Sequence, residues 1–316
     1  MVAYSGGFEW EAEDAAVTYW QTQGVTAGKA GGSSLVAVSW HYDEDLIAQD
    51  PSPAADGGDK GVRVSFADVS GLGGTVPYTH VLLVRSAETG GFAPITLMAG
   101  GIGWAGDYLY VAETDRGVRV FDLTRILEVS TAPECETAIG QVGDGYCAYG
   151  YSHVLPQVGS FYFPDGLSES CKPKFSFISV DTSAAVPSLL AGEYVNDDAE
   201  GIYSRLFRWS LDPASNRLAT GPTGAARPTA AWYAGNRNLQ GVAADGDKLI
   251  LNSTRYFGSL LTGAQDQPTA VYKATDGMWA WSPEGIHASD GVLWTCTQGH
   301  MSMPRVVFTA QTASIP

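Results

Sequence analysis

The chain has 316 residues, of which 45% are hydrophobic and 16% are charged, and it contains 38 glycines. So few charged residues argue against a disordered chain, a coiled coil and long surface helices, and favour a well-packed β protein. The 34 Asp and Glu residues outnumber the 18 Lys and Arg residues, which gives a net charge of −16. This charge repels nucleic acids and anionic membranes, so we expect neither as a partner, and an acidic ligand would need a local basic site.

The N-terminal segment MVAYSGGFEW has neither the basic region nor the apolar region of a secretory leader. Abundant Thr, Ser, Trp and Tyr, together with a predicted disulfide, nevertheless indicate a secreted, extracellular protein whose leader is absent from this sequence. No stretch approaches 18 apolar residues, and we therefore predict no membrane span.

Short segments of the chain repeat imperfectly. Residues 100–114 read GGIGWAGDYLYVAET, residues 240–254 read QGVAADGDKLILNST, and residues 284–298 read EGIHASDGVLWTCTQ. Fainter copies begin at Gln23 and Ser152. The three clear copies share a Gly followed by an apolar residue, then a turn, then a run of β-forming residues, which predicts two strands joined by a tight turn.

The spacing of the copies predicts the architecture. Two intervals between copies are long enough for two units each, with the missing starts near Gly61 and Gly201. Splitting those intervals gives seven units of about 45 residues, the length of one four-stranded blade of a β-propeller. We predict an all-β, single-domain β-propeller over residues 1–316 with seven blades, or six as the alternative. The run AAVTYWQ at residues 15–21 is predicted to be the outer strand of the last blade, so that strands from both termini close the ring.

Loops that follow the second strand of each unit are expected to meet at one mouth of the central channel. Alignment of the repeats on that strand places polar side chains at the same loop position in four units. They are His41, Arg116, Arg255 with Tyr256, and His300. Converging residues of these types at a channel mouth are what an active site needs. The alternative is that they are ordinary solvated turn residues.

His153 occupies the position that other units give to Gly241 and Gly285, and the channel wall would expose it to a ligand. Tyr151 lies two residues earlier and shares a face with His153 if the segment is extended. The alternative is a hydrogen-bonded core histidine, and His80, in the similar run YTHVLLV, ranks below His153.

Glu284 directly precedes Gly285 at the predicted mouth. A carboxylate there would serve as a general acid or base or as a metal ligand; the alternative is an ion pair with an arginine such as Arg237. Four tryptophans near predicted loop ends would suit the face of a sugar ring, or would pack between blades. They are Trp40, Trp232, Trp279 and Trp281.

Three of the four cysteines lie in one 37-residue stretch rich in Gly, Ser and Pro. We predict that Cys147 pairs with Cys171 or with Cys135, and that Cys296, within the strand-like run VLWTCT, is a buried free thiol. No Cys and His pattern has zinc-site spacing, so we predict no metal site. We predict no cofactor either, with a bound divalent cation such as calcium as the alternative.

The motifs GGIGWAGDYLYVAETDRGVRVFDL, YGYSHVLPQVG and KFSFISVD resemble those of secreted bacterial and fungal β-propeller proteins. More distantly, the chain resembles seven-bladed polysaccharide lyases of the rhamnose-glucuronate lyase type. That resemblance implies an extracellular enzyme that cleaves a polysaccharide at a uronic acid by β-elimination.

Such a reaction needs a base for the C5 proton, a positive charge at the carboxylate and an acid for the leaving oxygen. His153 or His300 as base, Arg116 and Arg255 at the carboxylate, and Tyr256 as acid meet these needs. The alternatives are a lectin-like propeller that binds sugars without turnover and a glycoside hydrolase that uses Glu284 and Asp115. We expect a monomer with a carbohydrate substrate or ligand.

Overall fold

The structure, a computed structural model, is built almost entirely of β-strands. It describes residues 2–47, 59–88, 90–168, 170–196, 203–254, 258–264, 273–274, 279–299 and 304–315. In these ranges the α-helices are two short ones, α1 (Ala12–Ala16) and α2 (Glu44–Ile47). None of the helices described has the length and apolarity needed to cross a bilayer. The all-β prediction is confirmed.

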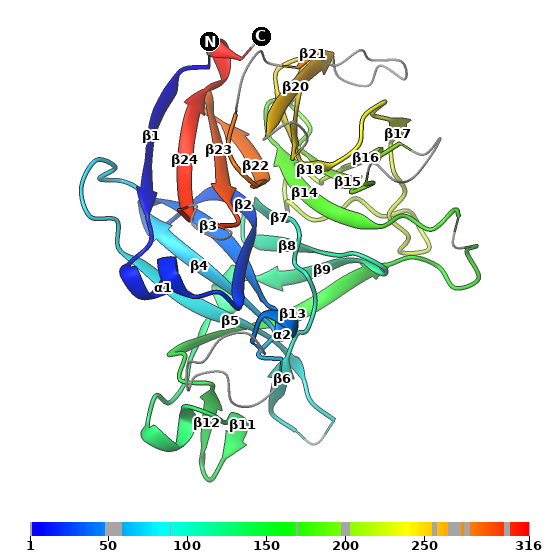
Figure 1. Ribbon diagram of the computed structural model, residues 1–316. Coiled ribbons are helices and arrows are strands. Elements are labelled where there is room, and N and C mark those ends of the chain that lie inside the picture. The colour runs from blue at the N-terminus through cyan, green and yellow to red at the C-terminus, as the bar shows by residue number, and fades with distance from the viewer. Residues whose placement is uncertain are drawn as a thin grey trace.

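The described strands form five antiparallel groups of four (Figure 1). The first group is β2 (Trp20–Ala30), β3 (Ser33–Tyr42), β4 (Val62–Asp68) and β5 (Tyr78–Ser86). The second is β7 (Ile102–Ala105), β8 (Tyr108–Glu113), β9 (Gly117–Asp122) and β13 (His153–Tyr162). The third is β14 (Phe175–Asp181), β15 (Ser188–Glu193), β16 (Arg205–Ser210) and β17 (Ala230–Tyr233). The fourth is β18 (Leu239–Asp245), β19 (Lys248–Ser253), β20 (Ser259–Ala264) and β21 (Lys273–Ala274), and the fifth is β22 (Pro283–Ser289), β23 (Val292–Thr297), β24 (Val306–Gln311) and β1 (Tyr4–Glu9).

The first two groups are joined into one ten-stranded sheet by β13, which changes partners along its length. Its residues 154–156 pair in parallel with β5, and its residues 157–162 pair antiparallel with β9. Two short strands, β6 (Phe92–Pro94) and β10 (Leu127–Glu128), complete this sheet.

Tight turns join the first two strands of four groups, as the sequence repeat predicts. Two residues separate β2 from β3, β7 from β8, β18 from β19, and β22 from β23. Gly106 and Gly246 each open such a turn with a positive φ, of 55° and 59°, which glycine adopts without steric cost. Four predicted copies of the repeat are therefore hairpins: those at residues 100–114, 240–254 and 284–298, and the fainter one at Gln23. The prediction of a further copy at Ser152 is wrong, because β13 is the fourth strand of its group and not the start of a new hairpin.

The first strands of the five groups contact one another in a cycle. β2 contacts β7, β7 contacts β14, β14 contacts β18, β18 contacts β22, and β22 contacts β2. A hydrophobic cluster fills the space between each consecutive pair of groups, including the fifth and the first, where Trp40 packs in the same cluster as Val307. The groups are thus arranged radially around one axis, as a propeller requires.

The prediction of seven or six units differs from these five groups. The first strands begin at residues 20, 102, 175, 239 and 283, so their spacing shrinks from 82 residues to 44 along the chain. Long connections between β3 and β4 and between β9 and β13 lengthen the first two described groups, and the number of blades stays a prediction. Gly61 directly precedes β4, the third strand of its group, and Gly201 lies outside the described residues.

Strands from both ends of the chain do share one sheet, as predicted, but the N-terminal segment differs. β1 pairs antiparallel with β24, and Gln311 N donates to Ala3 O at 2.9 Å, so the two ends lie side by side (Figure 1). Trp20 and Gln21, within the segment predicted for this role, instead begin β2, the inner strand of the first group. The earlier segment YSGGFE carries glycines and looks less strand-like than AAVTYWQ, which explains the wrong choice.

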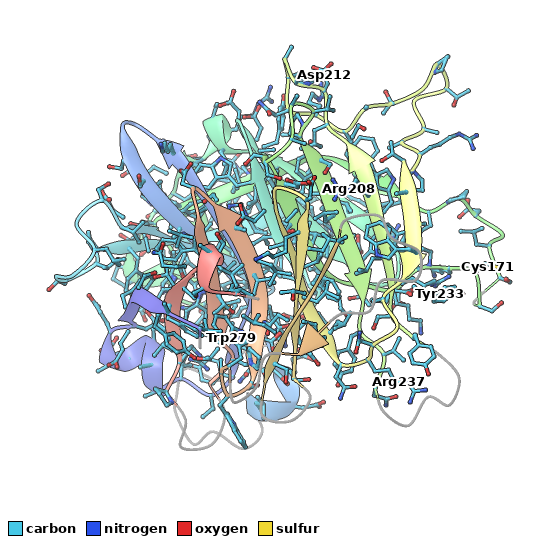
Figure 2. All side chains as sticks on the ribbon, turned by 90° about the horizontal axis from the view of Figure 1, so that it is seen from above. Cys171, Arg208, Asp212, Tyr233, Arg237 and Trp279 are labelled. Atoms are coloured by element: carbon cyan, nitrogen blue, oxygen red, sulfur yellow. A yellow bond between two sulfur atoms is a disulfide. The ribbon has the colours of Figure 1, made fainter. Side chains whose placement is uncertain are left out.

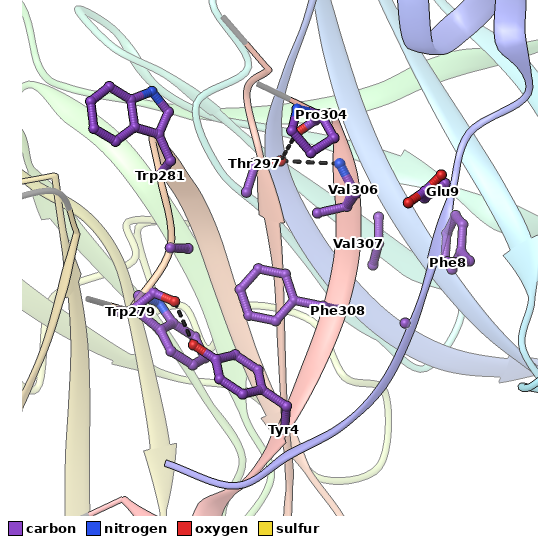
Figure 3. Close-up of a pocket in the computed structure, with 12 residues that line it drawn as sticks. Tyr4, Phe8, Glu9, Trp279, Trp281, Thr297, Pro304, Val306, Val307 and Phe308 are labelled. Carbon is purple, nitrogen blue, oxygen red and sulfur yellow. Dashed lines mark hydrogen bonds between the residues drawn. The ribbon is translucent and has the colours of Figure 1, made fainter. Parts of the chain in front are cut away.

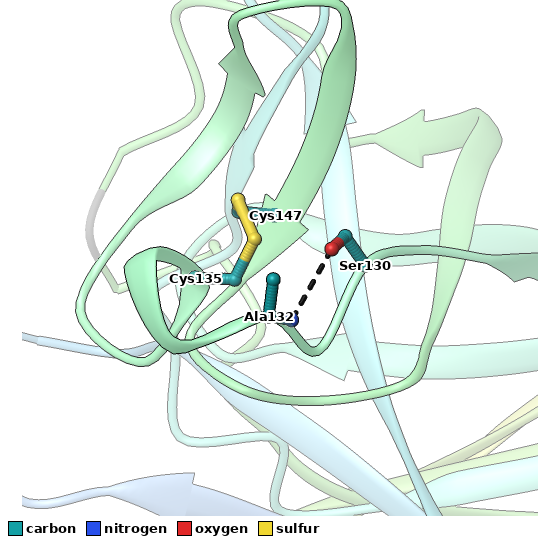
Figure 4. The surroundings of a disulfide bond; sticks show 4 residues. All are labelled: Ser130, Ala132, Cys135 and Cys147. Carbon is teal, nitrogen blue, oxygen red and sulfur yellow. Dashed lines mark hydrogen bonds between the residues drawn. A yellow bond between two sulfur atoms is a disulfide. The ribbon is translucent and has the colours of Figure 1, made fainter.

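A disulfide-bonded hairpin projects from the second group between β10 and β13 (Figure 1). The hairpin strands are β11 (Ile139–Val142) and β12 (Gly145–Ala148), and Cys147 of β12 is bonded to Cys135 (Figure 4). Nearby, Ser130 Oγ accepts a hydrogen bond from Ala132 N at 3.2 Å. This is one of the two predicted pairings, and Cys296 is a buried free thiol, also as predicted.

Candidate functional site

Neighbouring inner strands approach one another closely where the glycines of the repeat lie. A Cβ atom on Gly24 would lie 2.7 Å from the backbone N of Ile102, and one on Gly285 would lie 2.9 Å from Cα of Gly24. Any larger residue would force the backbones apart, since real Cβ atoms essentially never come closer than 3.0 Å. The repeated glycine of the sequence therefore marks backbone packing around the axis.

Four of the five inner strands contain a β-bulge. Strand register shifts between residues 22 and 25 of β2, 175 and 177 of β14, 239 and 241 of β18, and 283 and 286 of β22. Bulges leave one residue unpaired and re-aim its side chain, and they are frequent beside binding sites. The unpaired residues here are polar or glycine: Gln23, Gly24, Ser176, Gln240, Glu284 and Gly285.

Glu284 is the ionisable side chain in these bulges, and it is almost completely buried, at 2% exposure. Its Oε2 has no hydrogen-bond partner among the described residues, and burial raises the pKa of its carboxyl well above the usual value, which favours the neutral acid. Asp115, its partner in the hydrolase hypothesis, is exposed in the turn between β8 and β9. Within the described part of the chain no contact joins the two carboxyl groups, so the hydrolase pair stays a prediction.

His41 lies inside the protein at the end of β3, with 5% of its surface exposed. Burial lowers its pKa to about 4, although Asp43, at 3.9 Å from Nε2, acts in the opposite direction. His41 is therefore neutral at pH 7 and offers no charge to a ligand. Its Nδ1 has no hydrogen-bond partner in the described ranges.

Tyr151 belongs to a polar network around Asp14, which lies on the short helix between β1 and β2. Arg63 Nη1 donates to the hydroxyl of Tyr151 at 3.3 Å, and Arg63 Nη2 donates to Asp14 Oδ1 at 2.6 Å. Asp14 Oδ2 accepts from the hydroxyl of Tyr78 at 2.7 Å and lies 2.9 Å from His80 Nε2. Burial opposes ionisation of Asp14, but the hydrogen bond to His80 and the charge of Arg63 hold its pKa below the usual value. Sequence analysis ranked His80 low and missed Asp14, because 66 residues separate them.

The other predicted site residues lie apart. His153 is half-buried at the start of the outer strand β13, with its Nδ1 2.8 Å from Ser152 Oγ, so its predicted inner-strand position is wrong. Arg116 is exposed beside Tyr162 in the second group, and Arg237 stacks over Tyr203 at 5.1 Å. Arg255, Tyr256 and His300 lie outside the described residues.

An aromatic pocket of about 530 Å³ opens between the fifth group and the segment that leads into β22 (Figure 3). Tyr4 of β1 stacks on Trp279 with ring centres 5.8 Å apart and planes 11° from parallel, and its hydroxyl donates to Trp279 O at 2.6 Å. Phe308 of β24 packs against both rings, at 5.7 Å from Tyr4 and 5.1 Å from Trp279. Trp281 and Glu9 also line the pocket.

Polar groups in the pocket are few, and the ionisable ones include an acid but no base among the described lining residues. Glu9 is exposed and directly follows Phe8 of β1. Thr297 Oγ1 already donates to Pro304 O and accepts from Val306 N, both at 3.0 Å, which shapes this side of the pocket. Trp281 is 42% exposed, whereas Trp279 is buried. An aromatic wall with a few polar groups is the usual composition of a small-ligand pocket.

Sequence analysis identified part of this pocket. Trp279 and Trp281 are two of the tryptophans that it singled out for a sugar ring, while Trp40 and Trp232 are buried in hydrophobic clusters. Tyr4 was missed because 275 residues separate it from Trp279. Among the described residues, no three His, Cys, Asp or Glu side chains are grouped so as to hold a metal ion.

No family model and no curated protein matches the chain. Among solved structures, a complex of BT0996 with RGII aligns with a TM-score of 0.46 at 11% identity, over 98% of this protein and 92% of the other. A GH43_1 enzyme from Xanthomonas citri complexed with xylotriose aligns with a TM-score of 0.43 at 11% identity, over 95% and 91%. A mitotic checkpoint complex aligns with a TM-score of 0.41 at 9% identity, over 98% and 92%. Similarity at this level establishes no activity for this chain.

Proposed function

We propose that this protein is a glycan-binding β-propeller and that the pocket around Tyr4, Trp279 and Trp281 holds the sugar. The observation that carries the proposal is the combination of a half-exposed indole with two stacked rings and one carboxylate around a cavity of about 530 Å³. That volume lies within the range of small-ligand pockets. Aromatic faces pack against the C–H groups of a pyranose, and a carboxylate accepts hydrogen bonds from its hydroxyls.

The charge of the pocket favours a neutral sugar. Glu9 would repel a uronate carboxylate, and no Lys or Arg lines the described part of the pocket. The five groups are, in this proposal, the blades of a five-bladed ring that forms one domain over residues 1–316. The Cys135–Cys147 disulfide supports an oxidising, extracellular location.

Binding is tested on an array of neutral and uronate-containing oligosaccharides, with xylotriose as one neutral probe. We expect binding to neutral sugars, a loss of about tenfold or more in affinity in Trp281→Ala, and no loss in Tyr233→Ala. Tyr233 is a matched control because it is 62% exposed on β17, far from Trp279 in Figure 2. Absence of binding across the array, or equal binding by Trp281→Ala, would refute the proposal.

β-Elimination stays a separate prediction, because Arg255, Tyr256 and His300 lie outside the described residues. Incubation with uronate polysaccharides decides it. A rise in absorbance at the unsaturated-uronate band that is lost in Arg255→Ala supports a lyase. Release of reducing ends without that absorbance supports a hydrolase, and binding without either supports the sugar-binding function alone.

A further inference from the structure

We propose that a second cavity, between the second and third groups, binds an amphipathic anion. The apolar part of this ligand would lie among aromatic side chains, and its acidic group would lie on Arg116. The proposal is independent of the glycan pocket, which lies elsewhere: Figure 2 shows Cys171, which lines the second cavity, at the outer edge of the molecule and well away from Trp279.

The second cavity has a volume of about 570 Å³ and a mainly apolar wall. Phe175 forms its base, with ring centres 5.1 Å from Phe163, 5.6 Å from Phe207 and 5.5 Å from Trp209. Phe175 is buried, but the other three rings remain partly exposed. A partly exposed aromatic wall of this size would gain free energy by covering the apolar part of a ligand.

The same cavity continues into a polar one that contains Arg116. Tyr162 and Phe163 line both cavities, and the guanidinium of Arg116 lies 4.4 Å above the centre of the Tyr162 ring. The carboxylate that pairs with Arg116 is Glu113 at 4.0 Å, but Glu113 accepts a closer hydrogen bond of 2.9 Å from Arg119. The side chain of Arg116 is 59% exposed. Its N–H groups are therefore open to a ligand that lies in the aromatic cavity.

The anion would be recognised by direct hydrogen bonds to Arg116 rather than by a net positive electrostatic potential of the polar cavity. Asp115 and Asp165 line the polar cavity together with Arg116 and Lys172, so its formal charges balance. A stacked guanidinium presents its N–H edge in a planar fork that matches a carboxylate or sulfonate. The ligand class is thus an aryl or alkyl carboxylate or sulfonate, whose acid group reaches Arg116 while its apolar body stays in the cavity.

The test uses two fluorescent probes that differ in charge. 8-Anilinonaphthalene-1-sulfonate carries the sulfonate, and N-phenyl-1-naphthylamine has the same ring system without it. We expect the full-length protein to bind the sulfonate more tightly, and Arg116→Gln to weaken sulfonate binding about tenfold, the effect of one charge-assisted hydrogen bond. Binding of the neutral probe should stay unchanged in this variant, and Arg116→Lys should recover part of the sulfonate affinity.

A second measurement locates the site. Cys171 is an exposed free thiol at the cavity and Cys296 is buried, so a bulky maleimide should label Cys171 alone in the folded protein. Labelling should block sulfonate binding in the wild type. The Cys171→Ser variant should not be labelled, and its sulfonate binding should be unchanged by the reagent. Trp281→Ala, at the glycan pocket, should bind the sulfonate as the wild type does. Equal loss of both probes in Arg116→Gln, or sulfonate binding that survives labelling of Cys171, would overturn the proposal.

Discussion

Arg63 and Asp14 form an ion pair of 2.6 Å that links the two ends of the ring. Asp14 lies on α1, which connects β1 of the fifth group to β2 of the first, and Arg63 lies on β4 of the first group. Arg305, next to β24, also donates to the backbone carbonyl of Asp14 at 2.6 Å. The pair thus holds the connection between the strand that closes the ring and the sheet that begins it.

Replacement of Asp14 should destabilise the protein strongly. Asp14→Asn leaves Arg63 buried without a counter-charge, and breaking a buried pair of this kind costs about 3–5 kcal/mol. The free energy of unfolding in urea measures the loss. Glu13→Gln is the matched control, since Glu13 is exposed on the same helix and its replacement should change stability by less than about 0.5 kcal/mol. A loss in Asp14→Asn no larger than in the control would contradict the role assigned to the pair.

The buried histidines should lower the stability of the protein as the pH falls from 6.5 to 4, and Glu284, whose pKa burial raises, acts in the opposite direction. Burial lowers the pKa of both His41 and His287 to about 4, so the unfolded chain binds more protons than the folded one in this window. The stabilisation is complete above the unfolded pKa near 6.5 and is lost as the pH falls toward 4, at on the order of 3 kcal/mol per histidine. Below that window, stability should fall further as Asp14 takes up a proton.

Urea unfolding at about pH 7, 5.5 and 4.5 measures this dependence. His41→Gln should reduce the contribution of the histidines to the slope between pH 6.5 and 4, because it removes one of the histidines whose pKa burial lowers. An unchanged slope in His41→Gln would show that His41 does not titrate as its burial requires.

Replacement of a glycine of the inner strands by alanine should destabilise the protein. In Gly285→Ala the new Cβ would lie 2.9 Å from both Cα of Gly24 and N of Val25, so the backbone of β2 must shift, at a cost of about 1–3 kcal/mol. Gly159→Ala on the outer strand β13 meets nothing within 4 Å and should be neutral or slightly stabilising. Thermal unfolding compares the two variants, and equal melting temperatures would argue against close packing of the inner strands.

The thiols should react in a fixed order. One thiol, Cys171, is exposed, Cys296 is buried, and Cys135 and Cys147 are bonded to each other. Titration with a chromogenic disulfide reagent should therefore find one thiol in the native protein, two in denaturant and four after reduction. Two thiols that react at once in the native protein would show that Cys296 is accessible.

Local sequence pattern predicted the hairpins well, because a strand, a two-residue turn and a second strand are defined by residues that are neighbours in the chain. The repeated Gly at residues 24, 101, 241 and 285 likewise marked the inner strands. Splitting the long intervals between repeats predicted seven units, whereas the described strands form five four-stranded groups, the first of which contains a long connection at residues 43–61. The site was only partly predictable: Trp281 was identified, but Tyr4 and Glu9 were not.

The sequence by itself determined the class of fold, the inner hairpins and the burial of the Cys296 thiol. These features depend on short segments, in which alternating apolar residues, turn residues and buried positions can be recognised locally. Only the tertiary structure decided which segment closes the ring and which aromatic rings share a pocket. Those outcomes depend on contacts between residues hundreds of positions apart, such as Tyr4 with Trp279, and no local pattern records them. His41 and Arg116 show the same limit. They occupy equivalent positions in the sequence repeat, but His41 lies at the buried end of a strand in the first group, whereas Arg116 lies in an exposed turn of the second group.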